Sequence, residues 1–532
     1  MDRQRSILCL CTTILAATAA GSLFDEAARG SVIEVPADQP NIQAAIAAAV
    51  DGDVVVIAPG TYTGWANRDL DFAGKAITVR STDPGDPAVV AATVIDCGQA
   101  GRGFIFQSGE TPTSVVDGLT IINGFATDGA GVFLLNGSGA TIRSCVFSQN
   151  TVPDFRGVIQ NGNNPVEPAE LQIIDCTIQN NLGGGFTSYF IDTLTIRGST
   201  ISGNTGPGIS MSTFGTAHAR VEGCTITANG GAGINLKGGL LEVFDCTVTD
   251  NAEIGVSLNV SSGAIFDGDS VEISNSIISG NSSLTTVGGL KVHNQAGTSV
   301  LVRSCLITDN IGRTAGGMQL SGFENFLITT STIADNTATE LGGGGIRVTG
   351  GSTGASTDIR NCIIWGNTAP EGDQLLLNSL FNNPAIVSVD FCDLQGGAAS
   401  VAIDTACCSP SQLLFGKNNL DTDPLFLDPA SGDYHLSDES SAINAGDPDF
   451  VAAFDETDID GDPRVVGAQV DLGADEFRHP ADLNGDCAVN VLDLIQLLLD
   501  FGSAEAASDV NGDGAVNVLD LIELLLAFGS AC

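Results

Sequence analysis

The chain has 532 residues, with 63 Asp and Glu against 20 Lys and Arg, so its formal net charge is −43 at pH 7. A field of that sign repels phosphate backbones, which argues against nucleic acid as a partner, and it suits divalent cations. The length exceeds one ordinary domain and predicts a large elongated domain with a smaller one, while 66 Gly and 5% aromatic residues favour many tight turns over a helix-rich fold.

The first residues have the pattern of a secretory signal. Two arginines precede an apolar run from Ile7 to Ala17, and small residues follow with a cleavage position after Ala19. We therefore expect residues 1–19 to be a signal peptide. No later apolar run reaches the length that spans a membrane, so the mature protein is expected to be secreted or held at the cell surface.

Residues 31–90 are predicted to form an N-terminal cap and the first coils of the fold. The segment "NIQAAIAAAV" (41–50) repeats its apolar residues with helical spacing, and the strand-like "DVVVIAPGTY" follows it. A helix over the first coil would cover a sheet edge that is otherwise open. This stretch resembles the N-terminal cap of exported bacterial β-helix proteins.

Residues 91–400 contain an internal repeat with a spacing of 22 to 31 residues. Segments such as "DCTIQNN" (175–181) and "SCLITDN" (304–310) align on one Cys or Ser and on an Asn five residues later. Apolar residues stand three before and two after that Cys or Ser, and a glycine-led second strand such as "GAGINL" follows the Asn. The Asn column contains Asn150, Asn181, Asn204, Asn229, Asn251, Asn281, Asn310, Asn336 and Asn367. Each repeat therefore reads as strand, Asn turn, glycine turn, strand and variable loop.

Stacking such coils puts like residues above like, about 4.8 Å apart. Asn in every turn can then hydrogen-bond its neighbour, and Gly is expected to supply positive φ where the chain turns. The pattern resembles the repeats of the pectin-lyase-like superfamily, which implies a right-handed parallel β-helix but no particular activity. The predicted fold class is an all-β right-handed parallel β-helix (solenoid) with an N-terminal helical cap, plus a small α-helical C-terminal domain.

Seven cysteines occupy the repeat column in which Ser substitutes freely, so we interpret them as small buried side chains in an inner stack. They are Cys145, Cys176, Cys224, Cys246, Cys305, Cys362 and Cys392. No disulfide pattern can be assigned from the sequence to Cys97, Cys407 or Cys408.

Basic residues on the repeats are few, and no catalytic residue is predicted. Arg143, Arg197, Arg303 and Arg360 share one column, two residues before the Cys or Ser, which predicts one outward strand face. Anionic sugar could bind there, although spacing along the coils also suits solvated arginines over acidic strands. Lys291 and His293 form the best local pair for acid–base work.

Residues 401–478 are predicted to close the β-helix. Segments "DYHLSDESSAINAGD" and "DIDGDPRVVGAQVDLGADEF" resemble the part of the chain that commonly closes such helices in exported β-helix proteins. Between residues 421 and 476 there are sixteen acids and one Arg. Asp458, Asp460 and Asp462 could bind calcium or form a solvated acidic turn, and both interpretations stay open.

Residues 481–532 contain two acidic loops, each followed by an apolar helix, "LIQLLLDFG" and "LIELLLAFG". Calcium takes several hard oxygens from one short loop, with a closing carboxylate at position 12. Two matched loops predict two Ca²⁺ sites. At positions 1, 3, 5, 7, 9 and 12 the loops offer Asp482, Asn484, Asp486, the Ala488 carbonyl, Asn490 and Asp493, and Asp509, Asn511, Asp513, the Ala515 carbonyl, Asn517 and Asp520.

The duplicated loop–helix with Asp at position 12 resembles a type I dockerin domain, which implies calcium-dependent folding and a cohesin-like partner. Two features depart from that pattern. Position 6, usually Gly, is Cys487 in the first copy, and positions 10 and 11 are Val491–Leu492 and Val518–Leu519 instead of a small hydroxyl pair. The recognition face is therefore expected to be apolar, and a calcium-stabilised cap without a partner is the alternative.

Cys487 and Cys532 lie at opposite ends of this small domain, and in a secreted protein they could form a disulfide. For the whole chain, the leading hypothesis is a secreted or surface β-helix protein that binds polysaccharide or has a structural, adhesive role. The alternative is a polysaccharide lyase or glycoside hydrolase docked through its dockerin-like domain. The chain contains no adjacent Asp pair, no His-Gly and no Arg-Ile-Lys, motifs that such enzymes use, which weakens the alternative.

Overall fold

The computed structural model describes residues 30–162, 169–213, 217–260, 270–295, 299–322, 325–351, 356–379, 383–404, 410–453, 456–504 and 508–530. The predicted signal peptide, residues 1–19, lies outside these ranges, as do Cys407, Cys408 and Cys532. No helix of the described residues is long and apolar enough to cross a membrane.

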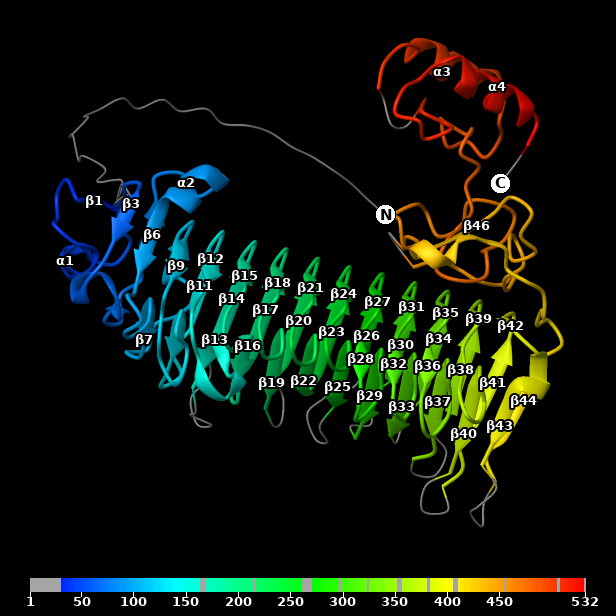
Figure 1. Ribbon diagram of the computed structural model, residues 1–532, viewed down its shortest axis with the longest axis horizontal. Coiled ribbons are helices and arrows are strands. Elements are labelled where there is room, and N and C mark those ends of the chain that lie inside the picture. The colour runs from blue at the N-terminus through cyan, green and yellow to red at the C-terminus, as the bar shows by residue number, and fades with distance from the viewer. Residues whose placement is uncertain are drawn as a thin grey trace, which may run out of the picture.

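The described chain forms a right-handed β-solenoid in which three long sheets run side by side along one axis (Figure 1). Within each sheet every strand pairs in parallel with the equivalent strand of the next coil. Sheet A contains β1 (Val32–Val35), β2 (Val54–Ile57), β5 (Thr78–Ser81), β8 (Val115–Asp117), β11 (Ala140–Arg143), β14 (Glu170–Ile174), β17 (Thr193–Arg197), β20 (His218–Glu222), β23 (Leu240–Phe244), β26 (Ser270–Ser274), β30 (Ser299–Arg303), β34 (Phe326–Thr329), β38 (Ser356–Arg360), β41 (Ile386–Asp390) and β44 (Gln412–Phe415).

Sheets B and C complete each coil. Sheet B contains β3 (Gly60–Tyr62), β6 (Thr93–Asp96), β9 (Thr120–Ile122), β12 (Val146–Ser148), β15 (Thr177–Gln179), β18 (Thr200–Ser202), β21 (Thr225–Thr227), β24 (Thr247–Thr249), β27 (Ile277–Ser279), β31 (Leu306–Thr308), β35 (Thr332–Ala334), β39 (Ile363–Trp365) and β42 (Asp393–Leu394). Sheet C contains β4 (Leu70–Asp71), β7 (Phe104–Phe106), β10 (Val132–Leu134), β13 (Gly157–Asn161), β16 (Gly184–Ser188), β19 (Ile209–Ser212), β22 (Ile234–Gly238), β25 (Val256–Val260), β29 (Leu290–Asn294), β33 (Met318–Gly322), β37 (Ile346–Thr349), β40 (Leu375–Asn378) and β43 (Val401–Ile403).

The remaining elements are short. A small parallel sheet lies at the turns, and an antiparallel pair lies outside the solenoid. These strands are β28 (Ser282–Ser283), β32 (Ile311–Gly312), β36 (Thr337–Ala338), β45 (Phe426–Asp428) and β46 (Asp433–Leu436). The helices are α1 (Ile42–Ala48), α2 (Pro87–Ala92), α3 (Val491–Leu499) and α4 (Val518–Leu526), with 3₁₀ turns η1 (Trp65–Asn67), η2 (Pro153–Phe155), η3 (Gly397–Ser400) and η4 (Pro429–Ser431).

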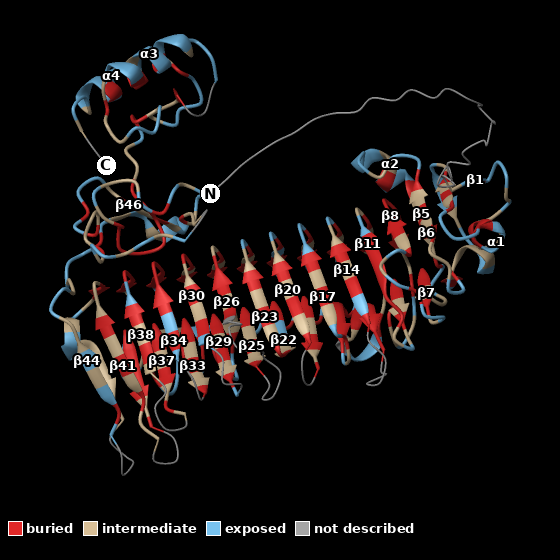
Figure 2. Cartoon of the chain, turned by 180° about the vertical axis from the view of Figure 1, so that it is seen from behind, coloured by how far each residue is buried: buried red, intermediate tan, exposed pale blue. Residues whose placement is uncertain are grey.

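The predicted columns line the interior of the solenoid, where Figure 2 shows buried residues along the strands. Ile196, Val221 and Val243 stack in register on neighbouring strands of sheet A, each fully buried. The seven column cysteines are buried and free, as predicted. Burial of each Ile or Val side chain of the columns stabilises the fold by about 1.5–3 kcal/mol. The repeat in the sequence is therefore mainly a packing pattern.

The predicted asparagine ladder is confirmed. Asn229 is buried, and its Nδ2 donates to the Asn251 side chain (3.1 Å) and to a backbone carbonyl one coil earlier (3.0 Å). Its Oδ1 accepts from the backbone and side-chain nitrogens of Asn204 (3.2 and 3.0 Å). The same side-chain bond links each step from Asn150 to Asn367 at 2.9–3.1 Å.

The glycine that directly precedes each second strand has a different role from the predicted one. Positive φ falls on the residue before the ladder Asn, as at Asp250 (55°) and Asp309 (57°). A Cβ on Gly233 would lie 2.5 Å from the Val248 side chain and 2.7 Å from the Gly255 carbonyl oxygen. This glycine is therefore required by close packing between coils, and the positive-φ interpretation is wrong there.

The N-terminal helix forms as expected. Asn41 caps α1 by accepting the Ala44 N–H (2.9 Å), and Ile42, Ala45 and Ile46 are buried. The helix packs against β1, β2 and β4 at the first coil. It therefore covers apolar surface at the N-terminal end of the solenoid.

Residues 417–478, here called the cap, leave the solenoid after β44 and lie beside its last coils (Figure 1). The Tyr434 hydroxyl donates to Asp309 (3.0 Å) and Asp335 (2.9 Å), on two successive turns of the solenoid. The cap, which was predicted to close the β-helix, is thus attached along the side of the coils.

Arg464 organises the cap from within. Its side chain is fully buried, and its guanidinium donates to the carbonyl oxygens of Ala474 (3.0 Å) and Gly473 (2.7 Å). Glu476 lies 3.9 Å away, and burial raises the pKa of its carboxyl to about 8. Arg464, the one arginine between residues 421 and 476, therefore links separate parts of the cap through buried hydrogen bonds.

Candidate functional site

The first acidic loop brings its carboxylates together. Oxygens of Asp482, Asp486 and Asp493 lie within 4.8 Å of one another. Asp493 is fully buried at the start of α3, where it accepts the backbone N–H groups of Asn484 (3.1 Å) and Asn490 (2.7 Å). Three acids converge on one point, and the loop bends around it.

The second loop repeats this geometry. Asp520, also fully buried, accepts the N–H groups of Asn511 (3.1 Å) and Asn517 (2.7 Å). Asp509 accepts the N–H groups of Asp513 (3.1 Å) and Gly514 (2.7 Å). The second loop therefore repeats the hydrogen-bond pattern of the first, with the closing Asp of each loop buried at the start of the following helix.

The remaining predicted ligands lie in these loops as well. The amides of Asn490 and Asn517 donate to the carbonyl oxygens of Ala488 and Ala515, both at 2.7 Å. Side-chain oxygens of positions 1, 5 and 12 and the position 7 carbonyl are the hard donors that calcium prefers. Arg478 lies beside the first loop, with Nε 3.8 Å from Asp482. Carboxylates that converge within 4.8 Å, two of them buried, fit a divalent cation.

Position 6 needs the left-handed backbone in both copies. Cys487 has φ 67° and Gly514 has φ 91°. Cys487 is disulfide-bonded. Because Cys532 lies outside the described residues, its pairing with Cys487 stays a prediction. The Val489 N–H donates to the backbone carbonyl oxygen of Ser530 (2.9 Å), so the end of the described chain lies at the first loop.

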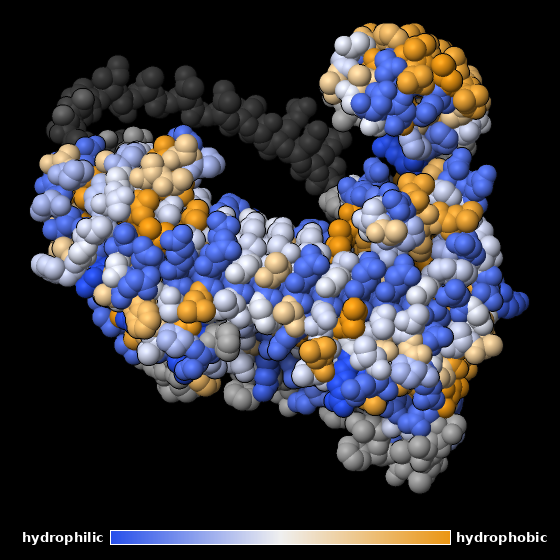
Figure 3. Space-filling model, viewed as in Figure 1, coloured by the Kyte–Doolittle hydropathy of each residue, from blue (hydrophilic) through white to orange (hydrophobic). Residues whose placement is uncertain are grey.

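The helices that follow the loops bury few of their apolar side chains. Leu497 of α3 and Leu524 of α4 are buried against each other's helix, with Leu494 and Leu521 beside them. The other large apolar side chains of these loops and helices are 47% to 82% exposed. They are Val491, Leu492, Ile495, Leu498, Leu499 and Phe501 in the first copy, and Val518, Leu519, Ile522, Leu525, Leu526 and Phe528 in the second. Figure 2 shows much of α3 and α4 as exposed, and Figure 3 shows apolar surface on this part of the molecule.

A group of charged side chains lies on the outer face of sheet A, at β20 and β23. His218 Nε2 lies 2.5 Å from Glu242, and Arg220 bridges Glu222 (2.9 Å) and Glu242 (3.5 Å). The Arg220 guanidinium also lies over the Phe244 ring, 4.4 Å from its centroid. We call these five residues the sheet A cluster.

Two carboxyls at this place have opposite pKa shifts. The hydrogen bond from His218 lowers the pKa of Glu242. Asp245, which follows β23, has its pKa raised by partial burial and by the nearby Glu222 carboxylate. A cavity of about 270 Å³ lies between Asp245 and Thr457 of the cap.

The sheet A cluster was not predicted from the sequence. The signal was available, because "HARVE" and "LLEVF" place the four polar side chains and Phe244 at alternate positions of two adjacent strands, and period 2 puts such residues on one face.

The four predicted arginines do share one column of sheet A, but three are paired with acids. Arg143 lies 2.8 Å from Asp117, Arg303 lies 2.7 Å from Glu272 and 3.3 Å from Glu456, and Arg360 lies 2.9 Å from Asp358 and 3.4 Å from Asp447. Arg197 is exposed, between Ile174 and Glu222 in the register. The structure does not bring these arginines together.

Other predicted residues have structural partners. His293 contacts Ser321 (2.9 Å) and Gln295 (2.8 Å), and burial lowers its pKa, with the charge of Lys291 acting in the same direction. Asp458 is buried and anchors its own turn by accepting the N–H groups of Asp460 (3.0 Å) and Asp462 (2.8 Å).

Comparison with known proteins identifies two regions. A family model described as a right-handed beta helix region matches residues 102–271 and 264–383, and a dockerin type I domain model matches residues 480–525. Dockerin type I domains bind calcium. No match was found among curated proteins.

Solved structures share the fold. The pectate lyase Pel9A is 15% identical with a TM-score of 0.36, covering 84% of this chain and 96% of that one. The catalytic domain of a GH87 α-1,3-glucanase in complex with tetrasaccharides is 12% identical with a TM-score of 0.42, covering 76% and 71%. The PL6 family polysaccharide lyase Pedsa3628 from Pseudopedobacter saltans is 11% identical with a TM-score of 0.34, covering 77% and 97%. These similarities concern the fold alone.

Proposed function

This chain belongs to the right-handed β-helix family, and from that premise we propose that it is an exported β-helix protein docked to a partner through its dockerin domain. In this proposal two calcium ions order the dockerin domain, helices α3 and α4 bind a cohesin-like protein, and the outer face of sheet A binds polysaccharide outside the cell or at its surface.

The observation that carries the proposal is the exposed apolar face of α3 and α4. Twelve large apolar side chains in a module of about fifty residues are exposed by roughly half or more. Soluble monomers rarely expose contiguous apolar patches of this kind, and such patches mark protein interaction sites. Leu492 and Leu519, at equivalent places in the two copies, are 52% and 51% exposed, so the face has matching halves.

The duplicated hydrogen-bond pattern of the loops supports the proposal of two calcium sites. Because Asp493 and Asp520 both close their loop and cap the following helix, calcium would order a loop and a docking helix together. Docking is therefore expected to depend on calcium.

The test uses the full chain, a panel of purified cohesin domains and titration calorimetry. We expect binding in calcium and none in excess chelator. Leu492→Asp with Leu519→Asp should weaken binding by about tenfold or more, as for residues central to an interface. The matched control is Leu284→Asp, because Leu284 is 84% exposed on the solenoid. Equal losses in both variants, or binding that survives the chelator, would contradict docking through this face.

Polysaccharide binding is supported by the sheet A cluster. Arg220, Glu222 and Glu242 present charged hydrogen-bonding groups around the Phe244 ring on one open face. A glycan array should detect binding that Arg220→Ala abolishes. Arg313→Ala is the matched control, because Arg313 is ion-paired to Glu340 and follows β32, outside sheet A. Binding that is unaffected by Arg220→Ala would exclude this face.

The alternative function, a polysaccharide lyase or glycoside hydrolase, is supported by the cavity that Asp245 lines beside β23, the strand that carries Glu242. The pKa of Glu242 is lowered and that of Asp245 is raised, which would suit separate base and acid roles. Incubation with polyuronates and neutral glycans, followed by unsaturated-product absorbance and reducing ends, decides between the two. Product that is formed by the native chain and lost in Glu242→Gln would establish enzymatic activity. If no glycan gives product, polysaccharide binding without catalysis remains the proposed function.

A further inference from the structure

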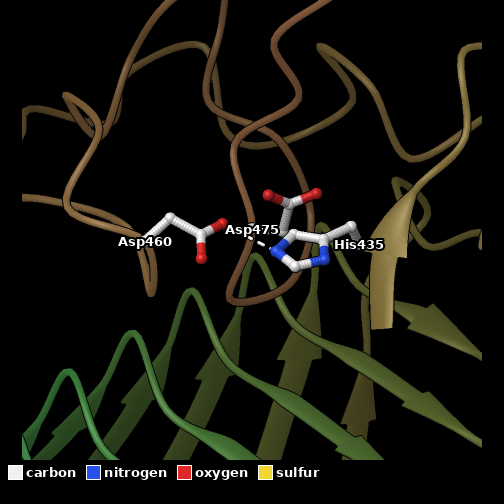
Figure 4. Close-up of side chains that lie close together, drawn as sticks. All are labelled: His435, Asp460 and Asp475. Carbon is white, nitrogen blue, oxygen red and sulfur yellow. Dashed lines mark hydrogen bonds and ion pairs between the residues drawn. The ribbon is translucent and has the colours of Figure 1, made fainter. Parts of the chain in front are cut away.

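The cap contains metal-ligating side chains that neither docking nor polysaccharide binding uses. His435 on β46, Asp460 on a turn and Asp475 on the following segment place one nitrogen and two carboxylate oxygens within 4.8 Å of one another. Figure 4 shows the imidazole facing the two carboxylates, which come from separate parts of the cap. We call these three residues the His435 group.

Each member of the group is held in place by a neighbour. Asp433 lies 2.6 Å from His435 Nδ1, so Nε2 is the ring nitrogen that faces Asp460, 2.7 Å from its carboxylate. Asp475 is 8% exposed and accepts the Leu436 N–H (2.8 Å). The geometry therefore leaves Nε2 and two carboxylates directed at a common point.

Negative charge is concentrated around this point. The cavity beside it is lined by six acids, against Arg478 and two histidines. The acids are Asp438, Asp460, Asp462, Asp475, Glu476 and Glu523. A divalent ion between the three side chains would neutralise part of this charge.

We propose that His435 Nε2, Asp460 and Asp475 bind a divalent transition-metal ion of the Zn²⁺ type. One imidazole nitrogen and two carboxylate oxygens are a typical donor set for such ions, whereas calcium takes oxygen alone. The Asp433–His435 bond is the second-layer contact that orients a ligating histidine. A cavity of about 420 Å³, which His435, Asp460 and Asp475 help to line, leaves room for water as a further ligand.

This site differs in chemistry from the calcium loops and lies in a different part of the chain. Its ligands come from β46, the turn at Asp460 and the segment at Asp475, so a bound ion would tie together three parts of the cap. Because the cap continues directly into the dockerin domain, the metal would stiffen the connection between the solenoid and its docking module.

The experiment uses tag-free full chain with calcium in excess, so that the dockerin loops are filled, and titrates Zn²⁺ by calorimetry. We expect one equivalent of Zn²⁺ to bind. His435→Ala should weaken binding on the order of 100-fold, and Asp433→Ala by about 10- to 100-fold, as for a contact behind the ligand. Co²⁺ in place of Zn²⁺ should give visible absorption bands that the His435→Ala variant lacks.

His479→Ala is the matched control, because His479 lines the same cavity but is outside the His435 group. Asp460→Asn provides a second variant at a half-exposed position, where the fold should tolerate the change. Absence of Zn²⁺ binding in the calcium-saturated chain would overturn the proposal. So would equal binding by the native chain, His435→Ala and Asp460→Asn, or loss of binding in His479→Ala alone.

Discussion

Removal of calcium should unfold the dockerin domain and leave the solenoid intact. The reason lies in the first loop, where carboxylate oxygens of Asp482, Asp486 and Asp493 are within 4.8 Å of one another. Asp482 and Asp493 are also buried, so water screens their charges poorly. Without a cation the three negative charges repel one another, because the folded loop keeps the carboxylates close together.

The magnitude can be worked from the distance. Two unit charges 4.8 Å apart repel by about 3.5 kcal/mol at an effective dielectric constant of about 20, so three pairs cost roughly 10 kcal/mol. The domain's buried core consists of Ala481, Val489, Leu497, Val516 and Leu524. A small core of this size supplies only about 3–5 kcal/mol of net stability. Arg478, with Nε 3.8 Å from Asp482, offsets part of this repulsion, and the rest is still comparable to or larger than the stability that packing supplies.

Circular dichroism of the full chain during chelator titration is the assay. Helix signal should disappear and strand signal should persist, and both should recover when calcium is restored. Asp493→Asn removes one charge, so it should retain more helix than the native chain in chelator while binding calcium more weakly. Asp500→Asn, outside the loop, should behave as the native chain. Helix content that chelator does not change at neutral pH would refute the reasoning.

The remaining predictions concern stability. Asn229→Ala leaves the buried Asn204 N–H without its acceptor and removes side-chain donation to Ile201 and Asn251, so it should cost about 3 kcal/mol in chemical unfolding, whereas exposed Asn235→Ala should cost under about 0.5 kcal/mol. Burial raises the pKa of Asp393 to about 7, so the native state holds a proton that the unfolded state releases above its ordinary pKa of 3.8, and stability should fall as pH rises between those values. Asp393→Asn should reduce the loss in Tm between pH 5 and pH 8 by the equivalent of about 2 kcal/mol, and an unchanged pH profile would contradict this assignment. If Cys487 pairs with Cys532, non-reducing peptide mapping will recover that pair, and reductant should destabilise the dockerin domain by about 4 kcal/mol; two free thiols would exclude it.

The solenoid was predictable from sequence because its stabilising contacts repeat. An Asn at position 229 contacts the Asn one coil before and one coil after, so a column in the sequence corresponds directly to a ladder in space. The inner Ile and Val columns follow for the same reason. The role of Gly233 did not follow, because a glycine in a turn is compatible with positive φ and with close packing, and only the coordinates distinguish them.

The existence of the cap as a separate segment was predictable from the sequence, but its contacts with the solenoid were not. Tyr434 contacts Asp309 and Asp335, 125 and 99 residues earlier in the chain, and no local pattern encodes such contacts. The same holds for Asp460, which the sequence grouped with its neighbours in one turn, whereas in the structure its carboxylate contacts His435. Helices α3 and α4 were predictable as elements, but their periodicity did not reveal that most of their apolar side chains face outward.

Buried charge is distributed unevenly between the solenoid on one side and the cap and dockerin loops on the other. The solenoid is held by buried apolar columns and an amide ladder, neither of which carries net charge. The cap and the dockerin loops concentrate buried acids, and Arg464 is the one basic residue between residues 421 and 476 apart from His435. The pKa of Glu476 is raised by burial although Arg464 lies 3.9 Å away, so the arginine offsets only part of the effect of burial. Under the proposals made above, metal ions would act on the cap and the dockerin domain, and the packing of the solenoid would not depend on them.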